Sequence, residues 1–103
     1  MKIYVMDLPL FSINVYIVES KFEKDDGKTW YVLKCVKGSD EGWRRNIPEA
    51  IINRMDEDLT MIVANDIDNL YGIYKSNARL LMENELRALK EIVRSKKEEF
   101  KNG

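Results

Sequence analysis

The apolar residues of this chain repeat at every second position in its first third and at every third or fourth position in its last third. Residues 2–6 and 12–18 alternate in the manner of strands. In the second of these segments, Ile13, Val15 and Ile17 fall on one side, with polar or aromatic neighbours on the other. Two strands are therefore predicted in the first 20 residues.

A third strand is predicted at residues 30–36, a run rich in β-branched and aromatic side chains. The polar stretch before it contains Asp26 and Gly27, a turn signal because glycine adopts positive φ without steric cost. The second and third strands are thus expected to form a hairpin.

The middle of the chain predicts shorter elements. Residues 43–47 indicate a short further strand. Pro48 suits the first turn of a helix because it has no N–H and a fixed φ, so a two-turn helix is expected at 48–55. Residues 59–64 fit either a strand or a helical extension, and the strand is favoured.

A single long amphipathic helix is predicted at 65–101, with Asn65 or Asp66 as its N-cap and Gly72 as its likeliest break. At about 100° per residue, twelve apolar residues fall within an arc of roughly 160°. They are Ile67, Leu70, Tyr71, Tyr74, Ala78, Leu81, Met82, Leu86, Ala88, Leu89, Ile92 and Val93. This arc predicts a face that packs on the sheet, until Lys96 interrupts it.

Three features of this helix suggest contacts with other molecules. Ile73 and Leu80 lie opposite the apolar arc, where they could form a small contact strip or be isolated exposed residues. Glu85 lies inside the arc, where an unpaired charge is costly. The last apolar residues have the 4-3-4 spacing of a coiled-coil seam that Glu85 would flank: Met82, Leu86, Leu89 and Val93.

The seam spacing leaves two interpretations open. Packing on the sheet of the same chain is favoured up to Leu81, whereas beyond Met82 a symmetric copy of the chain explains the pattern equally well. In a homodimer, Glu85 could pair across the interface and help to fix the register.

Together these elements predict one α+β domain over residues 1–103. Residues 1–64 are expected to form mainly strands, in an antiparallel sheet of three to five, with the short helix near 48–55. The long helix at 65–101 should pack on this sheet. A six-residue strand spans only about 20 Å, so the helix is expected to overhang the sheet.

Composition excludes several chemistries. The chain has no His and one Cys, Cys35, which lies in an apolar run and is expected to be a core thiol. No segment approaches the ~18 apolar residues of a membrane-spanning helix, and no secretory signal pattern opens the chain. A cytoplasmic protein without a cofactor or membrane contact is therefore expected.

Charge is unevenly distributed along the chain. Residues 1–74 hold 9 Lys and Arg against 13 Asp and Glu, whereas residues 75–103 hold 8 against 5. This mild dipole is not the strongly basic balance that is typical of nucleic-acid-binding proteins.

Five acidic residues form the best candidate for metal chemistry, since paired carboxylates can hold Mg²⁺: Asp56, Glu57, Asp58, Asp66 and Asp68. A turn at the first three and a helix cap at the last two explain the same residues without a metal. The structural interpretation is preferred, and no metal site is predicted.

Trp43, Arg44 and Arg45 combine an aromatic surface with two guanidinium groups. Such a group can anchor a protein interface or stack on bases. Alternatively, Trp43 belongs to the core and the arginines pair with nearby acids.

The function expected from these features is a non-catalytic protein-binding module. Small, motif-free chains without His are frequent among the accessory proteins of phages and mobile elements, so a regulator or inhibitor that docks on and occludes a larger protein is plausible on that base rate. The partner-binding residues would be Trp43, Arg44, Arg45, Ile73 and Leu80.

Two alternatives belong to other classes. A nucleic-acid-binding protein would use the Trp43 group with the basic helix end, comprising Lys90, Arg94, Lys96, Lys97 and Lys101. A Mg²⁺-dependent nuclease built on the acidic residues is the least favoured.

Overall fold

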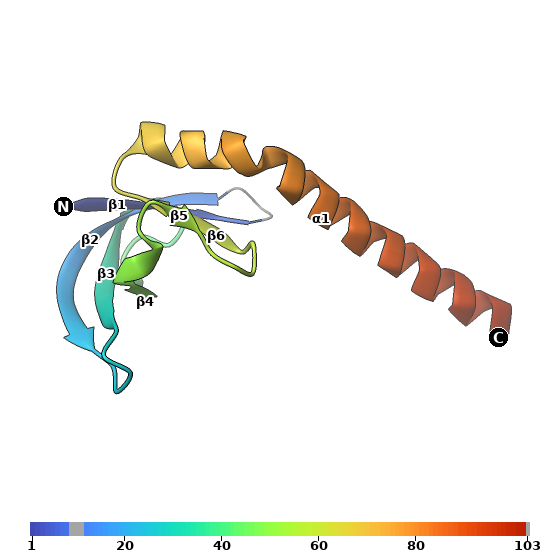
Figure 1. Cartoon of the computed structure of the whole chain (residues 1–103), viewed down its shortest axis with the longest axis horizontal. Helices are drawn as coiled ribbons and strands as arrows, with labels where there is room; N and C mark the ends of the chain where they lie inside the picture. Colours follow the sequence, from blue (N-terminus) through green and yellow to red (C-terminus); the bar gives the residue numbers. More distant parts are fainter. Residues whose placement is uncertain (9–11, 103) are drawn as a thin grey trace.

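The computed structural model describes residues 1–8 and 12–102, and shows an antiparallel sheet with one long helix lying across it (Figure 1). The fold is α+β, as predicted. The sheet has six strands in the order β4-β3-β2-β1-β6-β5. The elements in chain order are β1 (Lys2–Asp7), β2 (Ser12–Glu23), β3 (Thr29–Lys37), β4 (Arg44–Pro48), the 3₁₀ turn η1 (Glu49–Ile51), β5 (Arg54–Met55), β6 (Met61–Ala64) and α1 (Ile67–Asn102).

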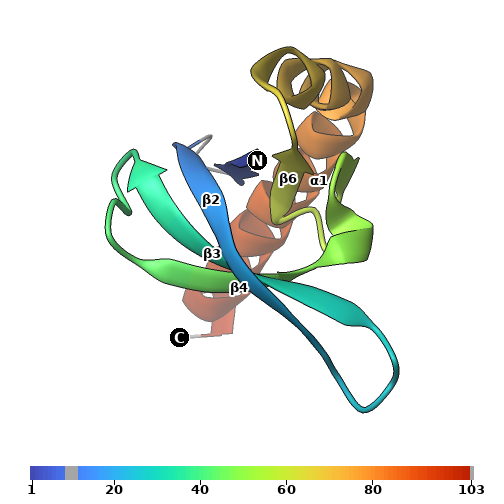
Figure 2. The same cartoon turned by 90° about the vertical axis from the view of Figure 1, so that its left-hand side faces the viewer.

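The predicted hairpin is formed by β2 and β3. Gly27 has a φ of 79° at its tip, and the Asp26 carboxylate accepts a hydrogen bond of 2.9 Å from the backbone N–H of Lys28. The register shifts after Val15 and again after Val18, and such irregularities bend a strand and increase its twist. The sheet is accordingly curled, with the hairpin extending away from the helix (Figures 1 and 2).

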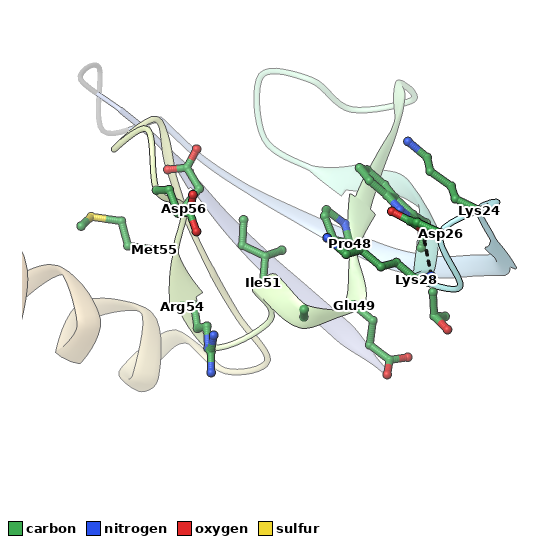
Figure 3. A pocket seen from close by; sticks show the side chains of 13 residues that line it. Lys24, Asp26, Lys28, Pro48, Glu49, Ile51, Arg54, Met55 and Asp56 are labelled. Atoms are coloured by element: carbon green, nitrogen blue, oxygen red, sulfur yellow. Dashed lines mark hydrogen bonds between the residues drawn. The ribbon is translucent and has the colours of Figure 1, made fainter.

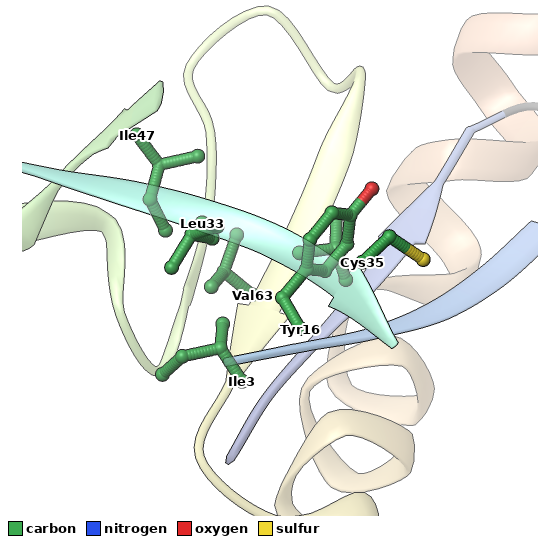
Figure 4. Close-up of a cluster of buried hydrophobic side chains, with 7 residues drawn as sticks. Ile3, Tyr16, Leu33, Cys35, Ile47 and Val63 are labelled. Atoms are coloured by element: carbon green, nitrogen blue, oxygen red, sulfur yellow. The ribbon is translucent and has the colours of Figure 1, made fainter. Parts of the chain in front are cut away.

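The larger core cluster lies on the inner face of the curled sheet (Figure 4). Its buried members are Ile3, Val5, Tyr16, Leu33, Cys35, Ile47 and Val63. Cys35 is 1% exposed, which confirms the core thiol. The two sides of β2 differ from the simplest expectation, since Asn14 and Tyr16 are buried while Ile17 is exposed. Because both faces of the sheet cover apolar clusters, alternation in β2 does not separate core from solvent.

A second, smaller cluster lies between the sheet and the first turns of α1. Its buried residues are Met6, Ile62, Ala64 and Leu70, and the half-buried Ile73 and Tyr74 pack against it. The helix begins as predicted, because the Asp66 carboxylate accepts a 2.7 Å hydrogen bond from the backbone N–H of Asn69. It continues through Gly72, the position at which a break was considered.

The predicted helix at 48–55 is wrong. Only the 3₁₀ turn η1 forms, and Ile52 at its end is extended, with a ψ of 131°. Ile51 and Ile52 pack against the larger cluster, and Asn53 then adopts a positive φ of 66° that stops any helix. Side-chain burial against the sheet therefore outweighs the local preference for a helix.

The six strands exceed the predicted three to five because the short segment after η1 joins the sheet. Arg54 and Met55 pair with Val63 and Ile62 as β5, an edge strand of two residues. So short a strand has no detectable sequence period, and only its pairing with β6 defines it.

Candidate protein-binding surfaces

The first candidate surface is the half of α1 that leaves the sheet. Up to Leu81 the helix presents a half-buried face towards β6 and β1, but from Met82 to Lys101 every residue is exposed. Figure 1 shows this half extending beyond the sheet to the C-terminus. The molecule measures 54 × 33 × 26 Å. Its longest dimension is about the length of a 36-residue helix at 1.5 Å per residue.

Exposed apolar residues are concentrated on one side of this half. We define the seam as Met82, Leu86, Leu89, Val93 and Phe100, which are between 52% and 81% exposed. At about 100° per residue these five residues fall within an arc of about 60°. The four apolar residues of the predicted oligomer interface belong to it, whereas the fifth, Glu85, does not, and Phe100 extends it by two turns.

The seam is not a continuation of the face that packs on the sheet. The half-buried and buried residues from Leu70 to Leu81 centre on a direction about 120° away from the seam around the helix axis. The predicted 160° arc had merged these two faces. Tyr71, assigned to the core-facing arc, is accordingly exposed.

This shift divides the predicted contact strip of Ile73 and Leu80. Ile73 packs against the smaller core cluster, whereas Leu80 remains 47% exposed. The expectation that both lie on a free face is therefore wrong, because the sheet-packing face lies closer to Ile73 than the merged arc implied.

Glu85, whose place in the apolar arc required an explanation, is exposed. It lies on the edge of the seam, about 70° from its centre. Within the described residues Glu85 forms no ion pair, unlike its neighbour Glu83, which pairs with Arg79 at 3.3 Å. Its carboxylate is therefore solvated in the isolated chain.

The second candidate surface surrounds Trp43, the last residue of the β3–β4 loop. Trp43 is 74% exposed, so it is not a core residue. Its backbone is fixed by a 2.8 Å hydrogen bond from the N–H of Cys35 to its carbonyl. The loop is held by Asn14, whose buried side-chain oxygen accepts a 3.0 Å hydrogen bond from the N–H of Asp40.

The two arginines beside Trp43 are already paired with acids. Arg44 donates two hydrogen bonds to Glu19, at 2.7 Å and 3.1 Å, and this pairing holds the pKa of Glu19 below its ordinary value. Arg45 donates to both carboxylate oxygens of Asp7 at 3.2 Å. Because each cation is neutralised within the chain, neither is free to bind a phosphate without giving up a carboxylate.

Arg45 also contacts Tyr16 from the edge of the core. Its guanidinium donates a 3.5 Å hydrogen bond to the Tyr16 hydroxyl. Burial raises the pKa of Tyr16, and the contact with Arg45 only partly opposes this effect. Burial lowers the pKa of Arg45, but hydrogen bonding and charge from Tyr16 and Asp7 outweigh it, so the pKa is raised. Arg45 therefore acts as a structural cation.

The nucleic-acid alternative also requires Trp43 and the basic helix end to share a face. The basic helix end lies in the half of α1 that projects beyond the sheet, whereas β4 lies within the sheet (Figure 1). At the helix end, Arg94 pairs with Glu91 at 2.7 Å. These pairings and this separation weaken the nucleic-acid interpretation.

Two of the five candidate acidic residues, Asp56 and Asp66, have structural partners. Asp56 accepts hydrogen bonds from the backbone N–H groups of Thr60 and Met61, at 2.7 Å and 3.0 Å, and from the Thr60 hydroxyl. Asp66 caps α1. Among the described residues, no group of three or more Cys, Asp or Glu side chains is arranged to hold a metal ion. The turn and cap interpretation thus accounts for Asp56 and Asp66.

A cleft of about 570 Å³ lies between the hairpin and the β5 region (Figure 3). Lys24, with its ammonium 3.6 Å from the centre of the Trp30 ring, lines one end. Arg54 and Asp56 line the other end. The hydrogen bond drawn from Lys28 to Asp26 belongs to the hairpin turn. Charges of both signs are spread around the cleft, and this distribution defines no particular ligand.

Comparisons with known proteins do not assign the chain to a family: no protein-family model, curated protein or solved structure matches it. Among the described residues, no helix has both the length and the apolar character needed to cross a membrane. The seam and the surface around Trp43 are therefore the two candidate binding surfaces.

Proposed function

We propose that this chain is a non-catalytic protein-binding module that docks on another protein through the seam of α1. The observation that supports the proposal is a helix half that leaves its own sheet while exposing five large apolar residues on one side. Monomeric proteins rarely expose contiguous apolar surface of more than a few hundred Å², and such surface marks interaction sites.

The division of the chain into a part that holds the core and a part that is exposed supports this proposal. The sheet and the first half of α1 hold the buried clusters, so the second half contributes exposed surface instead of core. A rigid helix that projects in this way can enter a groove or pair with another helix. Acting as a small regulator or inhibitor, the module would occlude the surface on which it docks.

The partner is either a second copy of this chain or a different, larger protein. Trp43 offers an additional anchor for a larger partner, since exposed Trp and Arg residues are enriched in binding hot spots. The seam alone is common to both cases, so it is the surface to test first.

The test compares two substitutions of equally exposed leucines on opposite sides of α1. Leu86→Glu places a charge in the seam, whereas the matched control, Leu80→Glu, places the same charge about 150° away. Binding is measured by affinity capture from host lysate after nuclease treatment, followed by titration with the purified partner. Leu86→Glu should weaken binding at least tenfold, and Leu80→Glu should not.

Two results would contradict the proposal. Binding that is lost on nuclease treatment would favour a nucleic-acid ligand. Binding that survives Leu86→Glu but is lost with Leu80→Glu would move the docking surface to the opposite side of the helix. Circular dichroism should show that both variants remain folded, since both positions are exposed.

A further inference from the structure

Resting on the proposed function, we infer that the partner of the seam is a second copy of this chain, and that the two helices pair in parallel as a short two-stranded coiled coil. The spacing of the seam is that of a heptad repeat. Leu86, Val93 and Phe100 occupy its a positions, and Met82 and Leu89 its d positions. A β-branched residue at a with leucine at d, as in Val93 and Leu89, favours two parallel strands.

The charges beside the seam are complementary to those of an identical helix. Glu85 and Lys90 lie about 70° to either side of the seam centre, at the flanking g and e positions. Because they are five residues apart, a parallel partner in register brings Glu85 of one helix next to Lys90 of the other. Two-fold symmetry creates this contact twice.

Neither of these flanking residues is neutralised within its own chain. Glu85 and Lys90 form no ion pair among the described residues, whereas Glu83 pairs with Arg79 and Glu91 with Arg94 on the same helix. The Glu91–Arg94 pair lies on the side of the helix away from the seam, whereas the Arg79–Glu83 pair lies at the start of the seam. Glu85 and Lys90 are thus unpaired charges of opposite sign on the two borders of the apolar face.

The position of the seam leaves room for a second helix. The sheet lies about 120° around α1 from the seam, so a partner helix can run alongside without meeting the sheet. The parallel arrangement places both sheets at the same end of the helix pair. Four consecutive apolar layers run from Met82 to Val93. Arg79 occupies the heptad position before them and Lys96 the position after them, so a cationic residue ends the apolar stretch on each side.

An antiparallel pair fits these charges less well. In an antiparallel pair, Leu86 of one helix packs against Leu89 of the other. This alignment places Lys90 of each helix next to Glu83 of the other helix. Glu83 already pairs with Arg79 at 3.3 Å, and Glu85 would face Ile92. The unpaired carboxylate of Glu85 therefore gains a cationic partner in the parallel pair only.

The experiment is sedimentation equilibrium of the full chain at low salt, at concentrations up to about 1 mM. The native chain should self-associate to a dimer. Glu85→Lys and Lys90→Glu should each weaken the dimer about tenfold, because each replaces two attractions with two repulsions. The double variant Glu85→Lys with Lys90→Glu restores complementarity and should return the dissociation constant to within about threefold of the native value.

Three results would overturn this inference. The first is that the double variant does not restore dimerisation. The second is that Glu83→Lys with Lys90→Glu restores it instead, which would make the pair antiparallel. The third is that the native chain remains a monomer throughout. If that monomer captures another protein and Leu86→Glu weakens the capture, the second-copy inference fails while the proposed function stands. If Leu86→Glu changes neither self-association nor capture of another protein, the inference and the proposed function both fail.

Discussion

Asn14 shows how one buried side chain positions an exposed surface. Its oxygen accepts hydrogen bonds from the N–H of Asp40 and, at 3.7 Å, from the Cys35 thiol. The loop approaches so closely that a Cβ added to Gly38 would lie within 2.2 Å of this oxygen, and Gly38 has a φ of 121°. Only glycine fits here, and the loop that ends at Trp43 is fixed as a result.

This arrangement could not be predicted from the sequence. Asn14 alternates with Ile13 and Val15 in the manner of a solvent-facing residue, and nothing in the alternation shows that both faces of β2 are covered. The sequence left open whether Trp43 is exposed or belongs to the core. The arginines beside it do pair with acids, but these are Glu19 of β2 and Asp7 of β1, which are distant from Arg44 and Arg45 in the sequence.

Tyr16 should make the fold sensitive to alkaline pH. Its pKa is raised in the folded state above the ordinary value of 10.0, because burial disfavours the charged phenolate. Below pH 10 the phenol is neutral in both states, and its contribution to stability is complete. As the pH rises through the folded pKa this contribution is lost, by at most about 1.4 kcal/mol per pH unit.

The corresponding experiment compares urea unfolding of the native chain and Tyr16→Phe. The free energy of unfolding of the native chain should fall more steeply above pH 10 than that of the variant. Between pH 6 and 9 the difference in the free energy of unfolding between the native chain and Tyr16→Phe should be constant, which serves as the internal control. Parallel curves over the alkaline range would show that the buried phenol is not responsible.

At the scale of elements, α1 illustrates what periodicity does and does not establish. Its start at Asp66, its length and its amphipathic character were predictable from local sequence. Its division into two faces was not predictable, because the predicted 160° arc contains both the residues that pack on the sheet and the residues of the seam. The packing of Leu70, Ile73 and Tyr74 in the smaller core cluster reveals the direction of the first face.

Gly72 is the element-scale site where a substitution should stabilise the protein. It lies inside the continuous helix, and an added Cβ would meet nothing within 4 Å. Gly72→Ala should therefore raise the free energy of unfolding by about 0.5–1 kcal/mol, since alanine loses less backbone entropy in a helix. Chemical denaturation measures this change directly.

Gly42 provides a matched control for this prediction. Its surroundings are equally open, but its φ is 91°. Gly42→Ala should therefore lower stability even though nothing obstructs the new methyl group. If Gly72→Ala were also destabilising, the helix would not be continuous at this position.

The shape of the whole molecule reflects the same division between core and exposed helix. Its radius of gyration is 17.1 Å, compared with about 13 Å for a compact domain of 100 residues. The larger radius of gyration comes from the projecting half of α1, which lengthens the molecule but adds no buried residues to the core. A helix of about 20 residues in water gains little stability from propensity alone, so a partner would order it further.

Removing this half should separate folding from association. The buried residues of both clusters precede Leu81, so a chain ending at Leu81 should retain its sheet and the first four turns of α1. Association raises the melting temperature as protein concentration increases, because only the folded chain binds. The full chain should show this dependence on concentration, and the shortened chain should not.

Calorimetry over a hundredfold range of concentration tests this expectation for both chains. At the lowest concentration, their melting temperatures should agree within about 4–8 °C, the change that 1 kcal/mol produces in a domain of this size. A much larger difference would mean that residues beyond Leu81 stabilise the sheet itself. The seam would then belong to the folding unit, and its exposed leucines would need an explanation within a single chain.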